Sequence, residues 1–150
     1  MTAPVQRTTV EGVLANHEKR VGNLEAVPLG GNYEIKVVSD TNVIQTGDSQ
    51  FVFVIPVNLT GRRLVEAHAF VSTVSSAGTP TVQIRNATTA ADMLSTRITI
   101  DVSEFTSFTA AVPAVTNMLT NGVVTGDLVA VDVDVAGTGA RGLGVILRFA

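Results

Sequence analysis

Residues 129–135 read Val-Ala-Val-Asp-Val-Asp-Val, with a β-branched apolar residue at every second position. Because successive side chains of a β-strand point to opposite faces, this alternation predicts a strand with one face in a core. Asp132 and Asp134 then share the other face. Two neighbouring carboxylates could bind Ca²⁺ or act as acid and base, but no Asp-rich loop with calcium spacing accompanies them. A solvated sheet face is the favoured interpretation.

The same period of two recurs on both sides of this stretch. Further strands are predicted within residues 33–37, 64–74, 81–85, 97–102 and 145–149. In residues 64–74 we expect Val65 to share the buried face with Ala67, Ala69 and Val71.

Residues 51–57 differ, because Phe-Val-Phe-Val-Ile-Pro-Val is apolar on both faces. Such a strand is expected to be buried on both sides, either inside the molecule or against a neighbouring subunit. Pro56 cannot donate a ladder hydrogen bond, so it limits the strand to a sheet edge or a strand end. Phe51 and Phe53 are therefore predicted oligomer-interface residues.

Turn sequences rich in Gly, Asn and Asp separate about eight predicted strands across residues 31–150. The chain contains 25 Val and 19 Thr, both β-branched and favourable in strands. This pattern predicts an all-β domain, a jelly-roll-like antiparallel β-sandwich.

Residues 1–30 are expected to form a separate N-terminal arm and helix. Thr8 and Glu11 have the spacing of a capping box, and Pro28 ends the predicted helix of residues 8–27. Its apolar positions follow a heptad, which predicts a short coiled-coil stem. The expected oligomer-interface residues of this stem are Val10, Leu14, His17, Val21 and Leu24. About 20 residues make a helix too short to hold an oligomer alone, so the β domain or a partner must contribute.

Composition argues against several classes of protein. The net charge is −3 and the eight Arg and two Lys are scattered, unlike a nucleic-acid-binding surface. There is no Cys, residues 1–10 lack the apolar core of a signal peptide, and no apolar run suggests membrane insertion. No cofactor is expected. The mean hydropathy of +0.36 is high for a soluble monomer and favours apolar surface covered by copies of the chain.

Several motifs resemble a known class of proteins. The stretches are residues 82–88, 92–96 and 98–101, then Glu104, Thr125-Gly126-Asp127 and Gly142-Leu143. Together they resemble small β-sandwich domains of tailed-bacteriophage tail-fibre, minor tail and capsid decoration proteins. Residues 20–25 look like the short trimeric stems that precede such domains. The resemblance implies a homotrimer, assembled in a bacterial cytoplasm and carried on a virion, whose residues 1–27 contact other virion proteins.

Few residues suggest a catalytic, metal-binding or ligand-binding role. His68 could belong to a Ser-His-Asp triad, but it lies on the polar face of a predicted strand, which favours a surface or inter-subunit role. Three copies of His17 on a trimer axis could bind a metal, although a tolerated polar core residue is the favoured interpretation. Phe105 and Phe108 are the best candidates for an exposed ligand-binding patch.

Three functional hypotheses follow. The preferred one is a non-enzymatic virion structural protein that anchors by its N-terminus and displays the β domain. The alternative is a receptor- or glycan-binding module for host attachment, against which the poverty of aromatic residues counts, since there is no Trp and one Tyr. The third, a small jelly-roll hydrolase, is disfavoured because the metal-binding type needs clustered histidines, and this chain has only His17 and His68.

Overall fold

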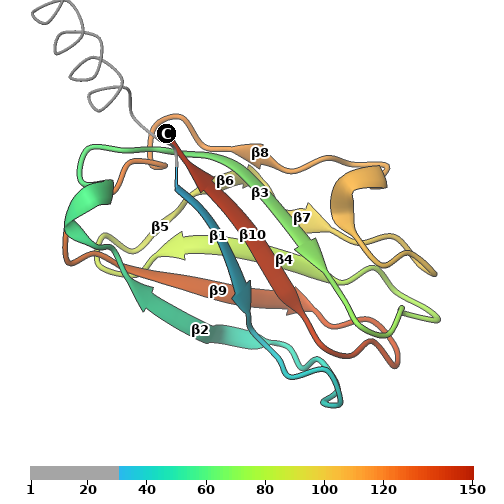
Figure 1. Ribbon diagram of the computed structural model, residues 1–150. Coiled ribbons are helices and arrows are strands. Elements are labelled where there is room, and N and C mark those ends of the chain that lie inside the picture. Colours follow the sequence, from blue (N-terminus) through green and yellow to red (C-terminus); the bar gives the residue numbers. More distant parts are fainter. Residues whose placement is uncertain (1–30) are drawn as a thin grey trace, which may run out of the picture.

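A computed structural model describes residues 31–150 (Figure 1). The predicted all-β class with antiparallel pairing is confirmed for this part of the chain. Two short 3-10 helices interrupt the strands, η1 (Val57–Leu59) and η2 (Ser107–Thr109). Among residues 31–150, no helix is long and apolar enough to cross a membrane.

The strands form two main sheets and one small one. The first sheet has the order β1-β10-β3, built from Gly31–Lys36, Gly144–Phe149 and Leu64–Phe70. The second has the order β2-β9-β4-β5, built from Gly47–Val54, Leu128–Val135, Thr81–Asn86 and Ala91–Asp92. Strand β7 (Ile98–Thr99) also pairs with β4, and β6 (Leu94–Thr96) pairs with β8 (Val115–Thr116). Successive long strands therefore cross repeatedly from one main sheet to the other.

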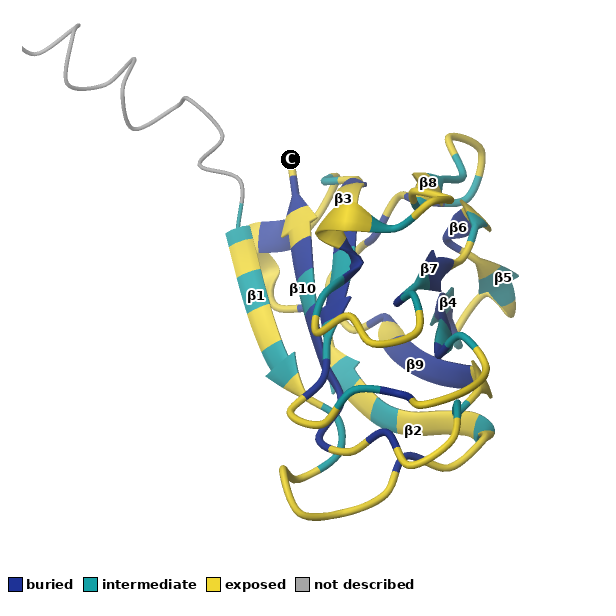
Figure 2. Cartoon of the chain, turned by 90° about the vertical axis from the view of Figure 1, so that its right-hand side faces the viewer, coloured by how far each residue is buried: buried dark blue, intermediate teal, exposed yellow. Residues whose placement is uncertain are grey.

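One hydrophobic core joins the two main sheets. Val145 and Leu147 from β10 belong to the same buried cluster as Val131 from β9 and Ile84 from β4. These are alternate residues of their strands, as the period of two predicts. Figure 2 shows the buried residues concentrated on β9 and β10, which lie inside their sheets, whereas the edge strand β2 is largely exposed.

A β-bulge changes the predicted face of β3. Leu64 pairs with Phe149 and Glu66 pairs with Arg148, so Val65 is an extra residue without a partner. Leu64 is consequently buried, and Val65 is exposed. The prediction that Val65 shares the core face was wrong, because an inserted residue breaks the strict alternation of faces.

Strand β2 is buried on one face only. Phe51 and Phe53 are partly buried and pack against the core, while Val52 and Val54, on the opposite face, are 43% and 58% exposed. The prediction of a strand buried on both sides within the molecule was therefore wrong. As Pro56 suggested, β2 is the edge strand of its sheet, and it ends at Val54, before the proline.

Candidate functional site

The outer face of the three-stranded sheet carries an ordered array of polar and aromatic side chains. The register places Glu34, Ile146 and His68 in one cross-strand row, and Lys36, Gly144 and Phe70 in the next. A side chain at Gly144 would overlap the Phe70 ring, so glycine lets this ring lie on the sheet. The Lys36 ammonium is 5.0 Å from the ring centroid, within the range of a cation–π contact.

The loop that contains η2 adds a second aromatic layer beside β3. Phe108 stacks on His68, with ring centroids 4.1 Å apart and an interplanar angle of 24°. The carbonyl oxygen of Phe105 accepts a hydrogen bond from the Val71 backbone at 2.8 Å, which ties the loop to the end of β3. Phe105 and Phe108 are 55% and 60% exposed, so the predicted aromatic patch is on the surface. We call Phe70, Phe105 and Phe108, with His68, the aromatic face.

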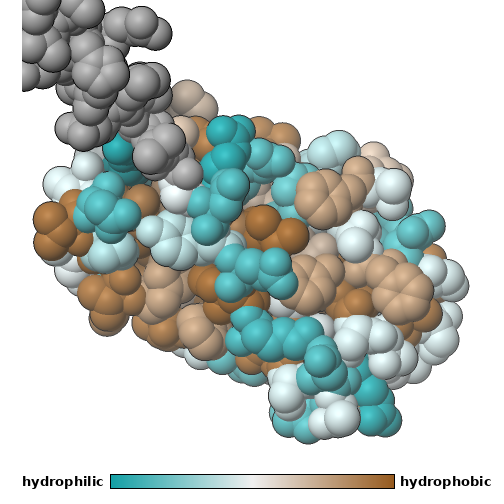
Figure 3. Space-filling model, in the orientation of Figure 1, coloured by the Kyte–Doolittle hydropathy of each residue, from teal (hydrophilic) through white to brown (hydrophobic). Residues whose placement is uncertain are grey.

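A polar network borders the aromatic face. Glu66 accepts hydrogen bonds from Arg148 Nε at 2.8 Å and from His68 Nε2 at 3.0 Å, through different carboxylate oxygens. The hydrogen bond from Arg148, followed by that from His68, lowers the pKa of Glu66 from its ordinary value of 4.5. Figure 3, which views this side of the molecule, shows hydrophilic and hydrophobic side chains next to one another across it.

The lowered pKa of Glu66 predicts a pH-dependent contribution to stability. A carboxylate with a depressed folded-state pKa stabilises the fold above its unfolded-state pKa, and this contribution is lost as the pH falls through the folded-state value. Because Glu66 and Arg148 are both nearly half exposed, we expect Glu66→Gln to cost less than about 1 kcal/mol at pH 7. Urea unfolding at pH 7 and pH 3 should show this difference shrinking in acid. A constant difference would mean that the charge of Glu66 is not its source.

The same network brings Ser107, His68 and Glu66 together, in the order of a Ser-His-acid triad. The Ser107 hydroxyl oxygen lies 3.3 Å from His68 Nδ1. However, Ser107 is only 7% exposed, and its hydroxyl oxygen accepts a hydrogen bond from the Ala69 backbone at 2.9 Å. A nucleophile needs an accessible oxygen with a free path to substrate. The geometry favours a structural role for Ser107, whose hydroxyl oxygen links η2 to the backbone of β3 by this hydrogen bond.

The two carboxylates of β9 lie on one face, as predicted, but each is paired with an arginine. Asp132 accepts a hydrogen bond from Arg85 Nε at 2.7 Å, and Asp134 forms an ion pair with Arg97. The hydrogen bond with Asp132 raises the pKa of Arg85. Asp132 is 5% exposed, so the interpretation of a simple solvated face was wrong for this residue. Within residues 31–150, no group of three or more His, Cys, Asp or Glu side chains is placed to hold a metal ion.

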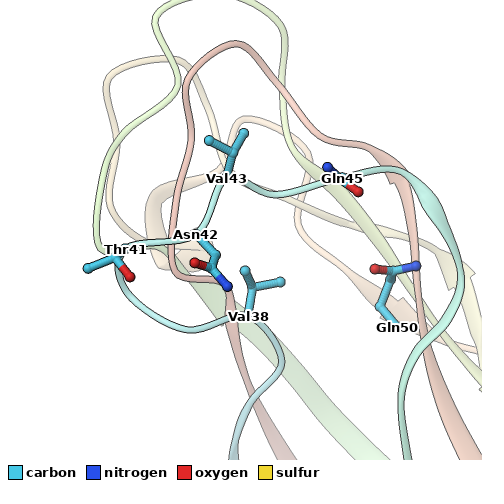
Figure 4. Close-up of a pocket in the computed structure, with 6 residues that line it drawn as sticks. All are labelled: Val38, Thr41, Asn42, Val43, Gln45 and Gln50. Carbon is cyan, nitrogen blue, oxygen red and sulfur yellow. The ribbon is translucent and has the colours of Figure 1, made fainter.

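A pocket of about 400 Å³, which sequence reasoning missed, lies beside the start of β2. Its lining residues come from the loop after β1 and from β2 itself: Val38, Thr41, Asn42, Val43, Gln45 and Gln50. Figure 4 shows these side chains around a common hollow, with Thr41, Asn42 and Val38 on one side and Gln45 and Gln50 on the other. The signal that could have found it is the cluster of amide residues on both sides of Gly47.

The predicted interface residues divide into two groups. Phe51 and Phe53 pack against the core instead of lying on the outer surface. The heptad residues, which are Val10, Leu14, His17, Val21 and Leu24, lie outside the described residues, as does the whole predicted segment 1–30.

No protein-family model matches the sequence, and no curated protein matches it significantly.

Proposed function

We propose that this protein is a non-enzymatic structural subunit of a tailed-phage virion, which associates as a homotrimer and displays a jelly-roll β-sandwich. The strand orders support the jelly-roll assignment. In each main sheet an early strand lies next to a late one, β1 beside β10 and β2 beside β9, which is how two Greek keys wrap around each other. The location on a virion rests on the sequence resemblance, since a fold alone does not imply a function.

The observation that carries this proposal is an exposed apolar patch at the end of β2. Val54 pairs in register with Leu128, and these side chains are 58% and 42% exposed. Thr60, just after η1, accepts a hydrogen bond from the Thr125 backbone at 2.8 Å, which holds the turn containing Val124 next to η1. We call Val54, Val57, Val124 and Leu128 the apolar patch. Figure 3 shows hydrophobic side chains, with hydrophilic ones between them, at the end of the molecule that carries η1.

Removing apolar surface from water is favourable by roughly 25 cal/mol per Å² of accessible area. Leaving such a patch exposed is therefore unfavourable. Adjacent apolar side chains on an edge strand and its neighbouring turns are the arrangement that an association surface needs. Covering the patch with copies of the same chain also accounts for the high mean hydropathy.

Native mass spectrometry of the full chain tests the proposal, with an expected mass three times that of the 15.6 kDa chain. Val54→Lys should shift the protein toward monomer, because it places an ammonium in an apolar contact. Val112→Lys is the matched control, since Val112 is 55% exposed but lies in a different loop. A monomeric wild-type protein would contradict the homotrimer. A trimeric Val54→Lys variant would show that the apolar patch is not the contact.

A receptor- or glycan-binding module is the second candidate function, and the aromatic face favours it. Phe105 and Phe108 are large apolar groups that the fold holds in place at the surface, which is the usual chemistry of a recognition surface. Binding of Phe108→Ala to host cells, compared with that of wild type, tests this candidate. Equal binding would remove Phe108 from any recognition role.

A further inference from the structure

We propose that the amide-lined pocket beside the start of β2 binds a neutral saccharide through the side chains of Asn42, Gln45 and Gln50. Its residues differ from those of the aromatic face and from those of the apolar patch. The proposal therefore goes beyond the assembly role and does not depend on it.

The chemistry of the lining indicates an uncharged, hydroxyl-rich ligand. Three amides and the Thr41 hydroxyl supply both hydrogen-bond donors and acceptors, and Val38 and Val43 supply apolar surface. No charged side chain lines the pocket, which disfavours phosphate and carboxylate ligands. A sugar ring presents the matching pattern, with hydroxyls that both donate and accept around apolar C–H faces. The volume of about 400 Å³ falls within the range of small-molecule sites.

The amides are available for a ligand. All three residues are exposed, and within residues 31–150 none of their side-chain amides forms a hydrogen bond to another protein group. Buried amides elsewhere in the fold behave differently. The side chain of Asn121, for example, donates to the Leu64 carbonyl and accepts from Arg63. The amide donors and acceptors at the pocket therefore face solvent, and the hydroxyls of a saccharide can replace the water that hydrogen-bonds to them.

The backbone of the pocket loop is held in place by its neighbours. Arg141 Nη1 donates to the Thr41 carbonyl at 2.8 Å, and the Ser72 hydroxyl donates to the Asp40 carbonyl at 2.9 Å. The Ile44 backbone donates to the Ala140 carbonyl at 3.0 Å. A loop fixed before binding loses little conformational freedom when it takes a ligand.

The other wall of the pocket depends on a β-bulge in β2. Between the pairs Gly47–Val133 and Phe51–Val131, three residues of β2 oppose the single residue Asp132. The Asp132 carboxylate accepts a hydrogen bond from the Ser49 backbone at 2.6 Å, and Ser49 has a positive φ of 52°. Bulges of this kind redirect the side chains next to them. This bulge sets the position of Gln50 at the pocket.

Titration of the isotope-labelled full chain tests the proposal, using NMR to observe the side-chain amides. The probes are glucose, galactose, mannose and N-acetylglucosamine, each raised to about 100 mM, because small ligands with few contacts bind with dissociation constants on the order of 1 mM. We expect at least one sugar to shift the amide signals of Asn42, Gln45 and Gln50. The double variant Asn42→Ala/Gln50→Ala should weaken binding by at least about tenfold, from the loss of two hydrogen-bonding groups. Asn58→Ala, which removes an exposed amide outside the pocket, should bind like wild type.

Three results would overturn the proposal: no shift with any neutral sugar, shifts that survive in the double variant, or shifts produced by an uncharged tripeptide amide but by no sugar. The last result would identify the pocket as a peptide site. Native mass spectrometry of the double variant separates this test from that of the proposed function, because an unchanged oligomer mass shows that assembly is intact.

Discussion

Replacing Phe149 with Ala is expected to lower the free energy of unfolding by about 3–5 kcal/mol. Phe149 is fully buried, and its ring meets that of Tyr33 edge to face, with centroids 6.1 Å apart. It lies in β10, the central strand of its sheet, where it pairs with Gly31 of β1 and Leu64 of β3. Truncation leaves a cavity between strands that are fixed on both sides, so the surroundings can close only partly around it.

Urea unfolding at one fixed protein concentration measures this effect, because self-association would make the apparent stability depend on concentration. Phe105→Ala is the matched control. It removes the same atoms from a side chain that is 55% exposed, so we expect a change below about 1 kcal/mol. Equal losses for the two variants would contradict the burial of Phe149 as the cause.

The fold class could be predicted because alternation is a local property of the sequence. Residues 129–135 lie in β9 (Leu128–Val135), with Val129, Val131 and Val133 buried as the period of two predicts. The burial itself does not alternate, because Ala130 and Asp132 on the other face are buried too, and Val135, expected on the core face, is 42% exposed. Pairing is not local, and that is where the predictions failed. Nothing in the sequence Leu64-Val65-Glu66 indicates the pairing of this segment with β10. Leu64 pairs with Phe149 and Glu66 with Arg148, so Val65 is left without a partner. The predicted strand 97–102 shrinks to Ile98–Thr99 for a similar reason, since its pairing with β4 involves only two residues.

The candidate sites likewise combine features that are local in the sequence with features that depend on tertiary pairing. The surface exposure of Phe105 and Phe108 could be predicted, because a polar loop surrounds them in the sequence. The stacking of Phe108 on His68 could not, since it joins residues 40 positions apart. The pocket likewise depends on a bulge whose anchor, Asp132, comes from a distant strand. Sequence patterns therefore identify which residues are available for a site, while tertiary pairing decides which of them meet.

Asp132→Ala is expected to cost about 3 kcal/mol of unfolding free energy. The Asp132 carboxylate accepts hydrogen bonds from Arg85 Nε, from Arg85 Nη2 and from the Ser49 backbone N–H, so its removal leaves three donors without this acceptor. Side-chain exposures are 6% for Asp132 and 24% for Arg85, and a guanidinium so little exposed regains limited hydration. Asp134→Ala is the matched control, two residues along the same strand. Its ion pair with Arg97 is more exposed, at 34% and 52%, so we expect a loss below about 1 kcal/mol.

A double variant separates the charge of Asp132 from its packing. If the cost of Asp132→Ala comes mainly from an unpaired Arg85, then Arg85→Leu/Asp132→Ala should be more stable than Asp132→Ala alone, because no unpaired cation remains. If the two losses simply add, the ion pair is not the source, and the bond to Ser49 and the lost packing must account for the effect. The amide signals of Ser49 and Gln50 report on the bulge independently of stability. We expect them to move in every variant that lacks Asp132, including the double variant, because the carboxylate accepts the backbone N–H of Ser49 in its positive-φ conformation.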